Sequence, residues 1–105
     1  MQVFLIDPSN KSIQTVEIED GLQSIRQLIG FDSIDADEID ANGDRLYFDE
    51  SCFIRDQPHA GRFKLDNLAP VAGRGVIVGS DAAAGTSLTT PVITLEVLTT
   101  RVHFI

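Results

Sequence analysis

The chain has 105 residues, of which 43% are hydrophobic, and a formal net charge of −8. This composition predicts one small domain, residues 1–105, with its own core. The excess of carboxylates argues against direct binding to nucleic acid or to an anionic membrane, because such binding needs a basic surface. The single cysteine, Cys52, excludes an internal disulfide, and no apolar run approaches the about 18 residues of a membrane span. We therefore expect a cytoplasmic protein.

The first predicted elements are a hairpin and a helix. Two β-rich runs, Met1–Asp7 and Ser12–Glu19, flank the turn cluster Asp-Pro-Ser-Asn and predict an antiparallel pair. Apolar residues then recur at helical spacing over residues 22–29, after Asp20, which is a suitable cap, and before Gly30, which favours helix termination. We expect this helix to cover one face of a sheet.

The next stretch, FDSIDADEIDANGDRLYFDE, is strongly acidic. Its Asn42-Gly43 dipeptide predicts a two-residue hairpin turn between strands at about 33–41 and 44–50. In that register Asp40 faces Arg45 as a cross-strand ion pair. Alternation then turns one set of side chains toward the core, namely Ile39, Leu46 and Phe48. It turns the other set toward solvent, namely Glu38, Asp40, Arg45, Tyr47 and Asp49.

The second half contains a central strand and an ambiguous end. The apolar run 75–79 has strand length and predicts a strand that is buried on both faces, after a loop at 51–61 and a short strand Arg62–Leu65. Residues 80–89 predict an exposed loop. Thr90-Pro91 favours a helix start, although many β-formers follow. We favour a helix near 91–100 before a final strand, and a strand at 91–100 stays open as the alternative.

These elements predict an α+β fold, with an antiparallel or mixed sheet of five or six strands and one or two helices packed on one face. A sheet of this size must protect its edges, and pairing them between copies is a common solution. We therefore expect a homo-oligomer of unspecified number.

Metal and catalytic sites are weakly supported. Asp40-x-Asn42-x-Asp44 resembles the start of an EF-hand loop, but Arg45 stands where that loop needs Gly and Ser51 where it needs Glu. A pair of adjacent acids, Asp49-Glu50, would point to opposite faces of a strand. We expect no bound metal and no cofactor.

The cysteine and the two histidines do not form a recognisable catalytic set. Nucleophilic catalysis by Cys52 needs a base within hydrogen-bond reach, and neither His59 nor His103 is placed there by its position in the sequence. We therefore predict that the protein is not an enzyme. Whether Cys52 is reactive stays open.

A few residues are candidates for binding. Arg55, His59 and Arg62 form a modest cationic cluster in and beside the loop 51–61, and Arg74 lies in a Gly-Arg-Gly turn that precedes the central strand. Tyr47 is predicted to lie on the outward face of the acidic hairpin. The candidate binding residues are therefore Tyr47, Arg55, His59, Arg62 and Arg74.

The order of several short motifs resembles a known family. VEIEDGLQSIRQLIG is followed by an acidic strand, then LYFDE, then AGRGVIVGSD and a hydrophobic C-terminal segment. This order is similar to the small phage- and plasmid-borne proteins catalogued as domain of unknown function 3846. The resemblance implies a mobile-element accessory protein in a bacterial cytoplasm, without an established enzymatic activity.

We interpret the chain as a non-catalytic binding module that acts on a host protein. The first alternative is a sponge for a small anionic or cyclic-nucleotide ligand. An acidic mimic of DNA and a metal-dependent enzyme are disfavoured. The mimic is disfavoured because same-face side chains along a strand lie roughly 7 Å apart, whereas duplex DNA carries one charge per about 1.7 Å.

Overall fold

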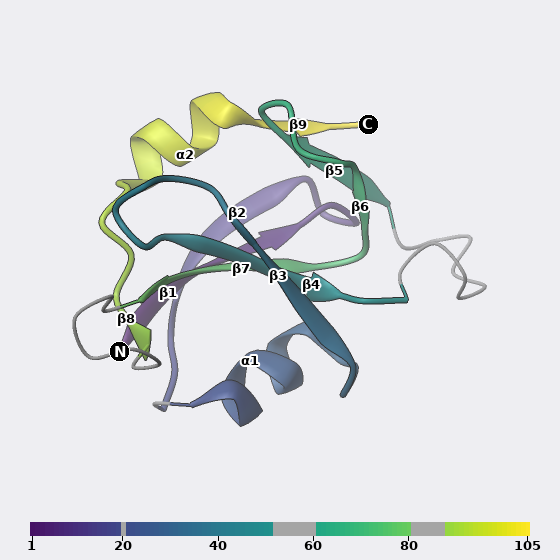
Figure 1. Cartoon of the computed structure of the whole chain (residues 1–105). Helices are drawn as coiled ribbons and strands as arrows, with labels where there is room; N and C mark the ends of the chain where they lie inside the picture. The colour runs from purple at the N-terminus through teal and green to yellow at the C-terminus, as the bar shows by residue number, and fades with distance from the viewer. Residues whose placement is uncertain (20, 52–60, 81–87) are drawn as a thin grey trace.

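Figure 1 shows the computed structural model of the chain, which describes residues 1–19, 21–51, 61–80 and 88–105. The elements in chain order are β1 (Gln2–Asp7), β2 (Ser12–Glu17), α1 (Leu22–Ile29), β3 (Ile34–Glu38), β4 (Arg45–Asp49), β5 (Arg62–Leu65), β6 (Val71–Ala72), β7 (Gly75–Ser80), β8 (Leu88–Thr89), α2 (Leu95–Arg101) and β9 (Val102–Phe104). The predicted α+β class is confirmed.

The described strands form two antiparallel sheets. The main sheet has six strands in the order β2-β1-β7-β4-β3, with β8 paired to β7 beside this path. The second sheet has the order β6-β5-β9. In the part of the chain that the structure describes, β2 and β3 are therefore the outer strands of the five-strand path, and β8 pairs with the end of β7 at Gly79 and Ser80.

The main sheet is covered on both faces, and this arrangement creates two cores. On one face, Ile25 and Ile29 of α1 pack with Tyr47, Val76 and Val3 of the sheet. The other face packs against the small sheet and α2, and its buried residues include Ile6, Leu46, Phe63, Leu65, Ile77 and Leu98. Figure 1 shows α1 below and α2 above the main sheet. Strand β7 supplies side chains to both cores, as predicted for the central strand.

The predicted first hairpin is confirmed. Strands β1 and β2 pair from Gln2 opposite Glu17 to Asp7 opposite Ser12. The Asp7 carboxylate holds the intervening turn, because it accepts hydrogen bonds from the Ser9 backbone N–H at 3.1 Å and the Asn10 side chain at 2.8 Å. This hairpin is therefore fixed by contacts close in sequence.

The helix over residues 22–29 is also confirmed, but its predicted cap is not. The N-cap position belongs to Gly21, which makes no side-chain hydrogen bond, and Asp20 lies outside the described residues. Gly30 ends the helix in the left-handed region at φ 92°, where a side chain is disfavoured.

The C-terminal helix starts later than predicted. Thr94, not Thr90, is the N-cap of α2, and its side chain accepts a hydrogen bond from the Val97 N–H at 3.3 Å. The helix therefore begins at Leu95 and runs directly into β9. The open choice between helix and strand is settled as helix for Leu95–Arg101.

The β3–β4 register differs from the predicted one by two residues. Glu38 faces Arg45 and Asp37 faces Leu46, so a longer loop than Asn42-Gly43 joins the strands. The loop closes with a hydrogen bond from the Ile39 N–H to the Asp44 carbonyl at 3.0 Å. Predicted strands at 33–41 and 44–50 are thus shorter, and the predicted Asp40–Arg45 pairing is wrong.

Candidate functional site

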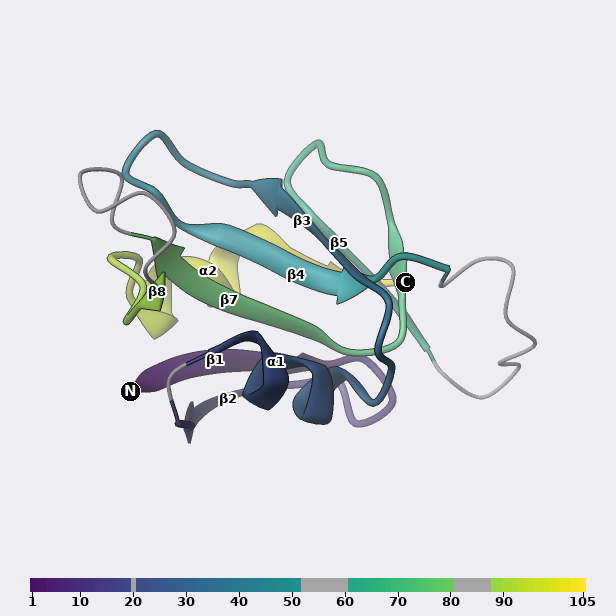
Figure 2. The ribbon, with the colours of Figure 1, turned by 60° about the horizontal axis from the view of Figure 1, so that its bottom comes forward.

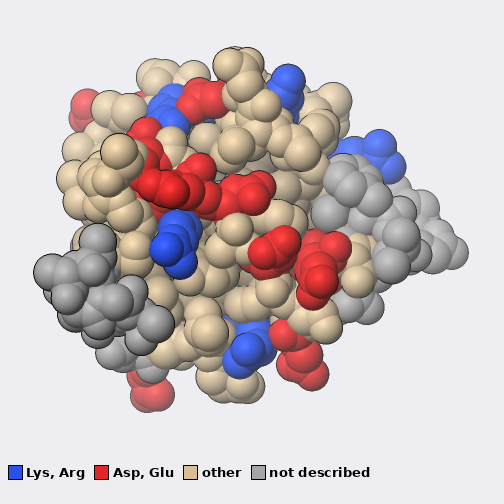
Figure 3. Space-filling model, in the orientation of Figure 1, with Lys and Arg blue, Asp and Glu red and all other residues tan. Residues whose placement is uncertain are grey.

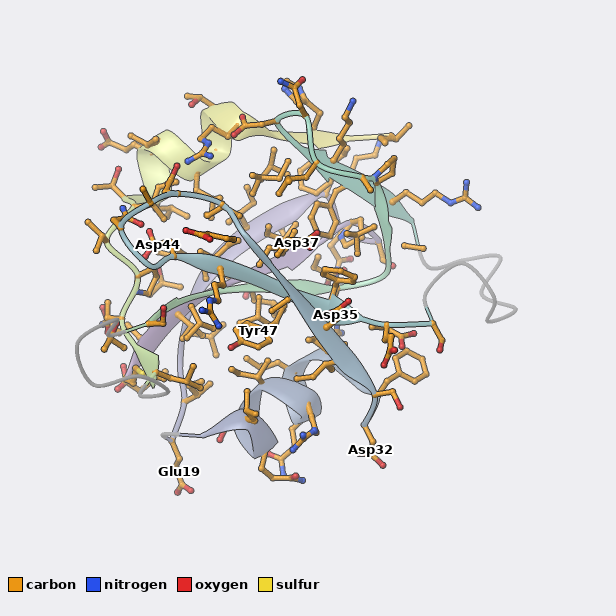
Figure 4. All side chains as sticks on the ribbon, viewed as in Figure 1. Glu19, Asp32, Asp35, Asp37, Asp44 and Tyr47 are labelled. Atoms are coloured by element: carbon orange, nitrogen blue, oxygen red, sulfur yellow. The ribbon has the colours of Figure 1, made fainter. Side chains whose placement is uncertain are left out.

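The most distinctive surface of the molecule is the outer strand β3, with sequence IDADE. Asp35 and Asp37 lie on the face of Leu46 and Phe48, and Glu38 lies on the opposite face beside Arg45. Asp35 and Glu38 are exposed and Asp37 is half-buried. Figure 3 shows acidic side chains as a band across the face where β3 runs in Figure 1, and Figure 4 shows Asp35 and Asp37 along the strand.

The backbone of β3 adds to this polarity. Two hydrogen bonds at the ends of β3 show which of its residues bond to β4. The Glu50 N–H donates to the Ser33 carbonyl and the Ile39 N–H donates to the Asp44 carbonyl, both at 3.0 Å. By alternation, Ile34, Ala36 and Glu38 direct their backbone groups away from β4. The outward N–H of Ala36 is already donated to Asp35 Oδ1 at 2.8 Å. The centre of this edge therefore presents mainly hydrogen-bond acceptors.

The loop after β3 is anchored by a buried carboxylate. Asp44 is fully buried and accepts hydrogen bonds from two backbone amides, Val92 N–H to Oδ1 at 2.9 Å and Ile93 N–H to Oδ2 at 2.8 Å. Its own N–H donates to Asn42 Oδ1 at 3.0 Å. Asn42 and Asp44, two of the three residues that resembled a calcium loop, thus make structural bonds within the protein. Figure 4 shows Asp44 in this loop, next to the segment before α2.

A second charged contact joins the same loop to the C-terminal helix. Arg101 Nη1 lies 2.9 Å from Asp40 Oδ2, and Arg101 Nη2 lies 2.6 Å from Asp66 Oδ2. The carboxylates of Asp66 and Asp40 raise the pKa of the Arg101 guanidinium. The Arg101 guanidinium also donates to the Ile39 carbonyl at 3.3 Å. Asp40 therefore contributes to the fold, which reduces the charge it offers to a partner.

Tyr47 is not on the surface. It is 8% exposed and packs in the core beneath α1, so its predicted outward position is wrong. The alternation along β4 was predicted correctly, since Leu46 and Tyr47 do lie on opposite faces. The face of β4 that carries Tyr47 is covered by α1 and is not exposed to solvent.

The two predicted cationic residues that the structure describes, Arg62 and Arg74, lie in different segments. Arg62 is exposed at the start of β5, opposite Ala72, and Arg74 is exposed in the turn before β7. Arg55 and His59 lie outside the described residues. Arg74 Nε lies 3.9 Å from Asp7 Oδ2, so a carboxylate balances part of its charge.

Arg74 also borders a small pocket of about 190 Å³, which has both polar and apolar lining residues. The buried carboxylate of Asp49 and the ring of Phe31 line the same pocket. Arg74 therefore has two carboxylates nearby. Asp7 lies beside its guanidinium, and Asp49 lines the same pocket. This charge balance does not favour an anionic ligand there.

The other predicted chemical groups remain separate. Asp49 is 2% exposed and accepts a hydrogen bond from the Ser51 N–H at 3.1 Å, whereas Glu50 is exposed, so the two acids do point apart. His103 is exposed on β9, while Cys52 and His59 lie outside the described residues. Within the described ranges, the structure contains no group of three or more metal-ligating side chains. The same ranges contain no helix that is long and apolar enough to cross a membrane.

Comparison with known proteins identifies the family. A family model described as Domain of unknown function (DUF3846) matches residues 1–102. The chain belongs to the DUF3846 family. No curated protein and no solved structure matches it.

In this DUF3846 chain, the motifs that carried the resemblance fall largely on buried elements. The helical part of the first motif forms α1, LYFDE lies on β4, and GVIVGS forms β7. These segments build the centre of the main sheet and the core beneath α1. The motifs therefore identify the fold and leave the function to be argued from the edges of the sheet.

Sequence reasoning missed the residues that shape this surface. Asp44 and Arg101 act on partners far away in the sequence, which no local pattern reveals, whereas Asp35 accepts a hydrogen bond from the amide of its neighbour Ala36. The available signal was the high density of carboxylates in IDADE, which has three acids in five residues and only Ile34 and Ala36 as apolar positions. Such a strand is typical of a sheet edge.

Proposed function

We propose that this DUF3846 chain is a non-catalytic binding module that recognises a basic surface of a partner protein through the outer edge of β3. The observation that supports this proposal is the acceptor character of that edge. Asp35, Asp37 and Glu38 place three carboxylates within one strand of five residues. Because Asp35 also occupies the outward N–H of Ala36, little donor capacity remains at the centre of the edge.

The chemistry of this edge selects a donor-rich partner. Guanidinium and ammonium groups are multiple donors without acceptor capacity, so Arg and Lys side chains complement carboxylates and outward carbonyls. A partner strand that adds to a sheet needs alternating donors and acceptors from the edge it joins. The edge of β3 therefore favours a basic patch over an added strand.

The overall charge supports the same function. A net charge of −8 attracts a basic partner at long range, and carboxylates at the contact raise the association rate and select against acidic partners. The three acids lie on both faces of the strand, and their spacing is too wide to imitate a DNA backbone. A host protein as partner and a role on a mobile element stay predictions that accompany this proposal.

The test is binding of a short Arg-rich peptide, measured by fluorescence anisotropy at low and at physiological ionic strength. We expect the variant D35N/D37N/E38Q to bind at least about tenfold more weakly than the native chain. A matched control, E19Q/E50Q/E96Q, removes the same formal charge from exposed acids elsewhere. We expect that control to lose no more than about threefold, through long-range electrostatics alone.

Two outcomes would contradict the proposal. One is equal weakening in both triple variants, which would mean that only net charge attracts the peptide. The other is tight binding that survives the β3 substitutions. Backbone amide shifts should locate the peptide on Ile34–Glu38 and leave the β1–β2 hairpin unchanged.

A further inference from the structure

The opposite edge of the main sheet, β2, has a different character. In the part of the chain that the structure describes, β2 pairs only with β1. Met1 and Ile18 exchange both backbone bonds, at 2.8 and 3.0 Å, which sets the alternation along the strand. Ile13, Thr15 and Glu17 therefore direct their N–H and C=O groups away from β1. This edge offers alternating donors and acceptors over its length.

The charge on β2 is nearly balanced. Glu17 is its one charged residue, and Glu17 Oε1 lies 2.7 Å from the N-terminal ammonium. An exposed lysine, Lys11, stands at the other end of the strand. Lys11 and Glu17 of one copy are separated by roughly 20 Å, because a strand rises about 3.3 Å per residue. They are too far apart to pair with each other.

We infer that β2 is the surface on which a second copy of this chain docks, by antiparallel pairing of β2 with β2. A two-fold axis at Gln14 places Ile13 opposite Thr15 of the second copy, and these two residues both have outward backbone groups. The same register places Lys11 opposite Glu17 of the second copy, twice per interface. The edge is thus complementary to itself in charge and in hydrogen bonding, as a symmetric dimer requires.

Other registers fit less well. Moving the axis to Thr15 sets Ile13 against Glu17 and Lys11 against Glu19, which lies beyond the end of β2. A shift of one residue in the pairing of the two strands is excluded. Residues whose backbone groups point outward would then lie opposite residues whose backbone groups bond to β1. Of these registers, the axis at Gln14 is the one that gives Glu17, the charged residue of β2, a basic partner.

Apolar groups flank this edge on both faces of the sheet. On the α1 side, a groove of about 430 Å³ runs between β2 and α1; its apolar lining residues are Val16, Ile18 and Leu28, and its polar ones are Glu17, Glu19, Ser24 and Gln27. Leu22 of α1 is 41% exposed nearby in sequence. On the other side, α2 contacts β2 and leaves Val97 49% exposed. Figure 2 shows β2 at the rim of the molecule beside α1. A paired edge alone buries little surface, so these flanks supply the additional area that a stable dimer needs.

The first test is the mass of the native protein in solution, measured by sedimentation velocity over a range of concentrations. We expect a dimer. Thr15→Pro removes one outward N–H and should leave a folded monomer, because proline is tolerated on an edge strand where its missing N–H faces solvent. Ala36→Pro is the matched control at an outward position of β3, and it should remain dimeric. A monomeric native chain, or a folded Thr15→Pro dimer, would overturn the inference.

A charge exchange tests the register and does not depend on the proline variant. Lys11→Glu and Glu17→Lys should each raise the dimer dissociation constant by about tenfold, since each places like charges opposite one another twice. The double variant K11E/E17K should return to within about threefold of the native value. Failure of the double variant to recover would exclude this interface. Binding of the Arg-rich peptide should change by no more than about threefold in these charge variants, through long-range electrostatics alone, because β3 is untouched, so the two proposals fail separately.

Discussion

The two outer strands of the main sheet are built in different ways. Strand β2 is half of a local hairpin, held by a turn whose Asp7 carboxylate binds residues two and three positions later. Strand β3 ends in a loop that depends on the C-terminal segment, through Asp44 at Val92 and Ile93 and through Asp40 at Arg101. One edge is therefore set by neighbours in sequence and the other by contacts almost fifty or more residues away.

The edges differ equally in what they offer to another molecule. Strand β2 presents donors and acceptors with little net charge, which permits pairing with a copy of itself. Strand β3 presents carboxylates and a backbone N–H that its own Asp35 occupies, which opposes pairing with any strand. In our proposals, the carboxylates of the β3 edge serve two purposes, namely prevention of strand addition and attraction of a basic partner.

The largest expected effect concerns the anchor of the β3 end. Asp44→Ala leaves two buried amides without an acceptor and should lower the free energy of unfolding by about 3 kcal/mol. Chemical denaturation measures this loss. Hydrogen exchange should accelerate at the Ile39 amide and change little at Val16, since the β1–β2 hairpin does not use Asp44.

Asp37→Ala is the matched control for that substitution. It removes a carboxylate from the same hairpin at a half-buried position and should cost less than about 0.5 kcal/mol. Equal losses for Asp37→Ala and Asp44→Ala would contradict the role assigned to Asp44.

The hydrogen bonds of Asp44 also explain why only part of the fold could be predicted from the sequence. The first hairpin, α1 and the central strand follow from local patterns, and all three were predicted correctly. The predicted two-residue turn at Asn42-Gly43 is wrong. The Asp44 carboxylate accepts hydrogen bonds from the amides of residues 92 and 93, and Asp44 therefore lies in the loop. Gly43 has φ 99°, and a Cβ there would clash with the Ser80 carbonyl, so the close approach of this loop to β7 requires glycine.

Tyr47 shows a second limit. Alternation along a strand divides side chains between two faces, but it does not say whether a face is covered. Only the position of α1 decides that Tyr47 is buried, and this position depends on contacts among α1, β4 and β7. For the candidate site, the composition of β3 was visible in the sequence, whereas its edge position followed only from the strand order.

The ion pairs of Arg101 give the next largest effect. Arg101→Gln should lower the free energy of unfolding by about 1.5 to 2 kcal/mol, because it removes charge-assisted bonds from Asp40 and Asp66. The raised pKa of Arg101 means that its contribution is present at all pH values below the unfolded pKa and is lost only as pH rises through the folded pKa. We therefore expect the difference between native and variant to stay constant across neutral pH. A difference that disappears near neutral pH would contradict this assignment.

Replacing the acids of β3 tests whether they block the addition of another strand to this edge. The variant D35T/D37T/E38T removes the carboxylates and releases the outward N–H of Ala36. We expect it to self-associate beyond the dimer, with onset of light scattering at about tenfold lower concentration than for the native chain. A control that keeps Asp35, D37T/E38T, should scatter less. If both variants stay as soluble as the native protein, the carboxylates are not what blocks strand addition at β3.

The smallest expected effect separates the two uses of Glu17. Within one copy, the ion pair of Glu17 with the N-terminal ammonium is exposed on the carboxylate side, so Glu17→Gln should change the free energy of unfolding by no more than about 0.5 kcal/mol. Across the proposed dimer, the same substitution removes an attraction to Lys11 twice and should weaken association by about threefold. Sedimentation at low and high ionic strength measures this difference, which salt should reduce. An unchanged dissociation constant at low ionic strength would mean that Glu17 does not face Lys11 of a second copy. A weakened dimer with unchanged stability would place the function of this carboxylate between copies, in contrast to Asp44, whose whole contribution lies within one.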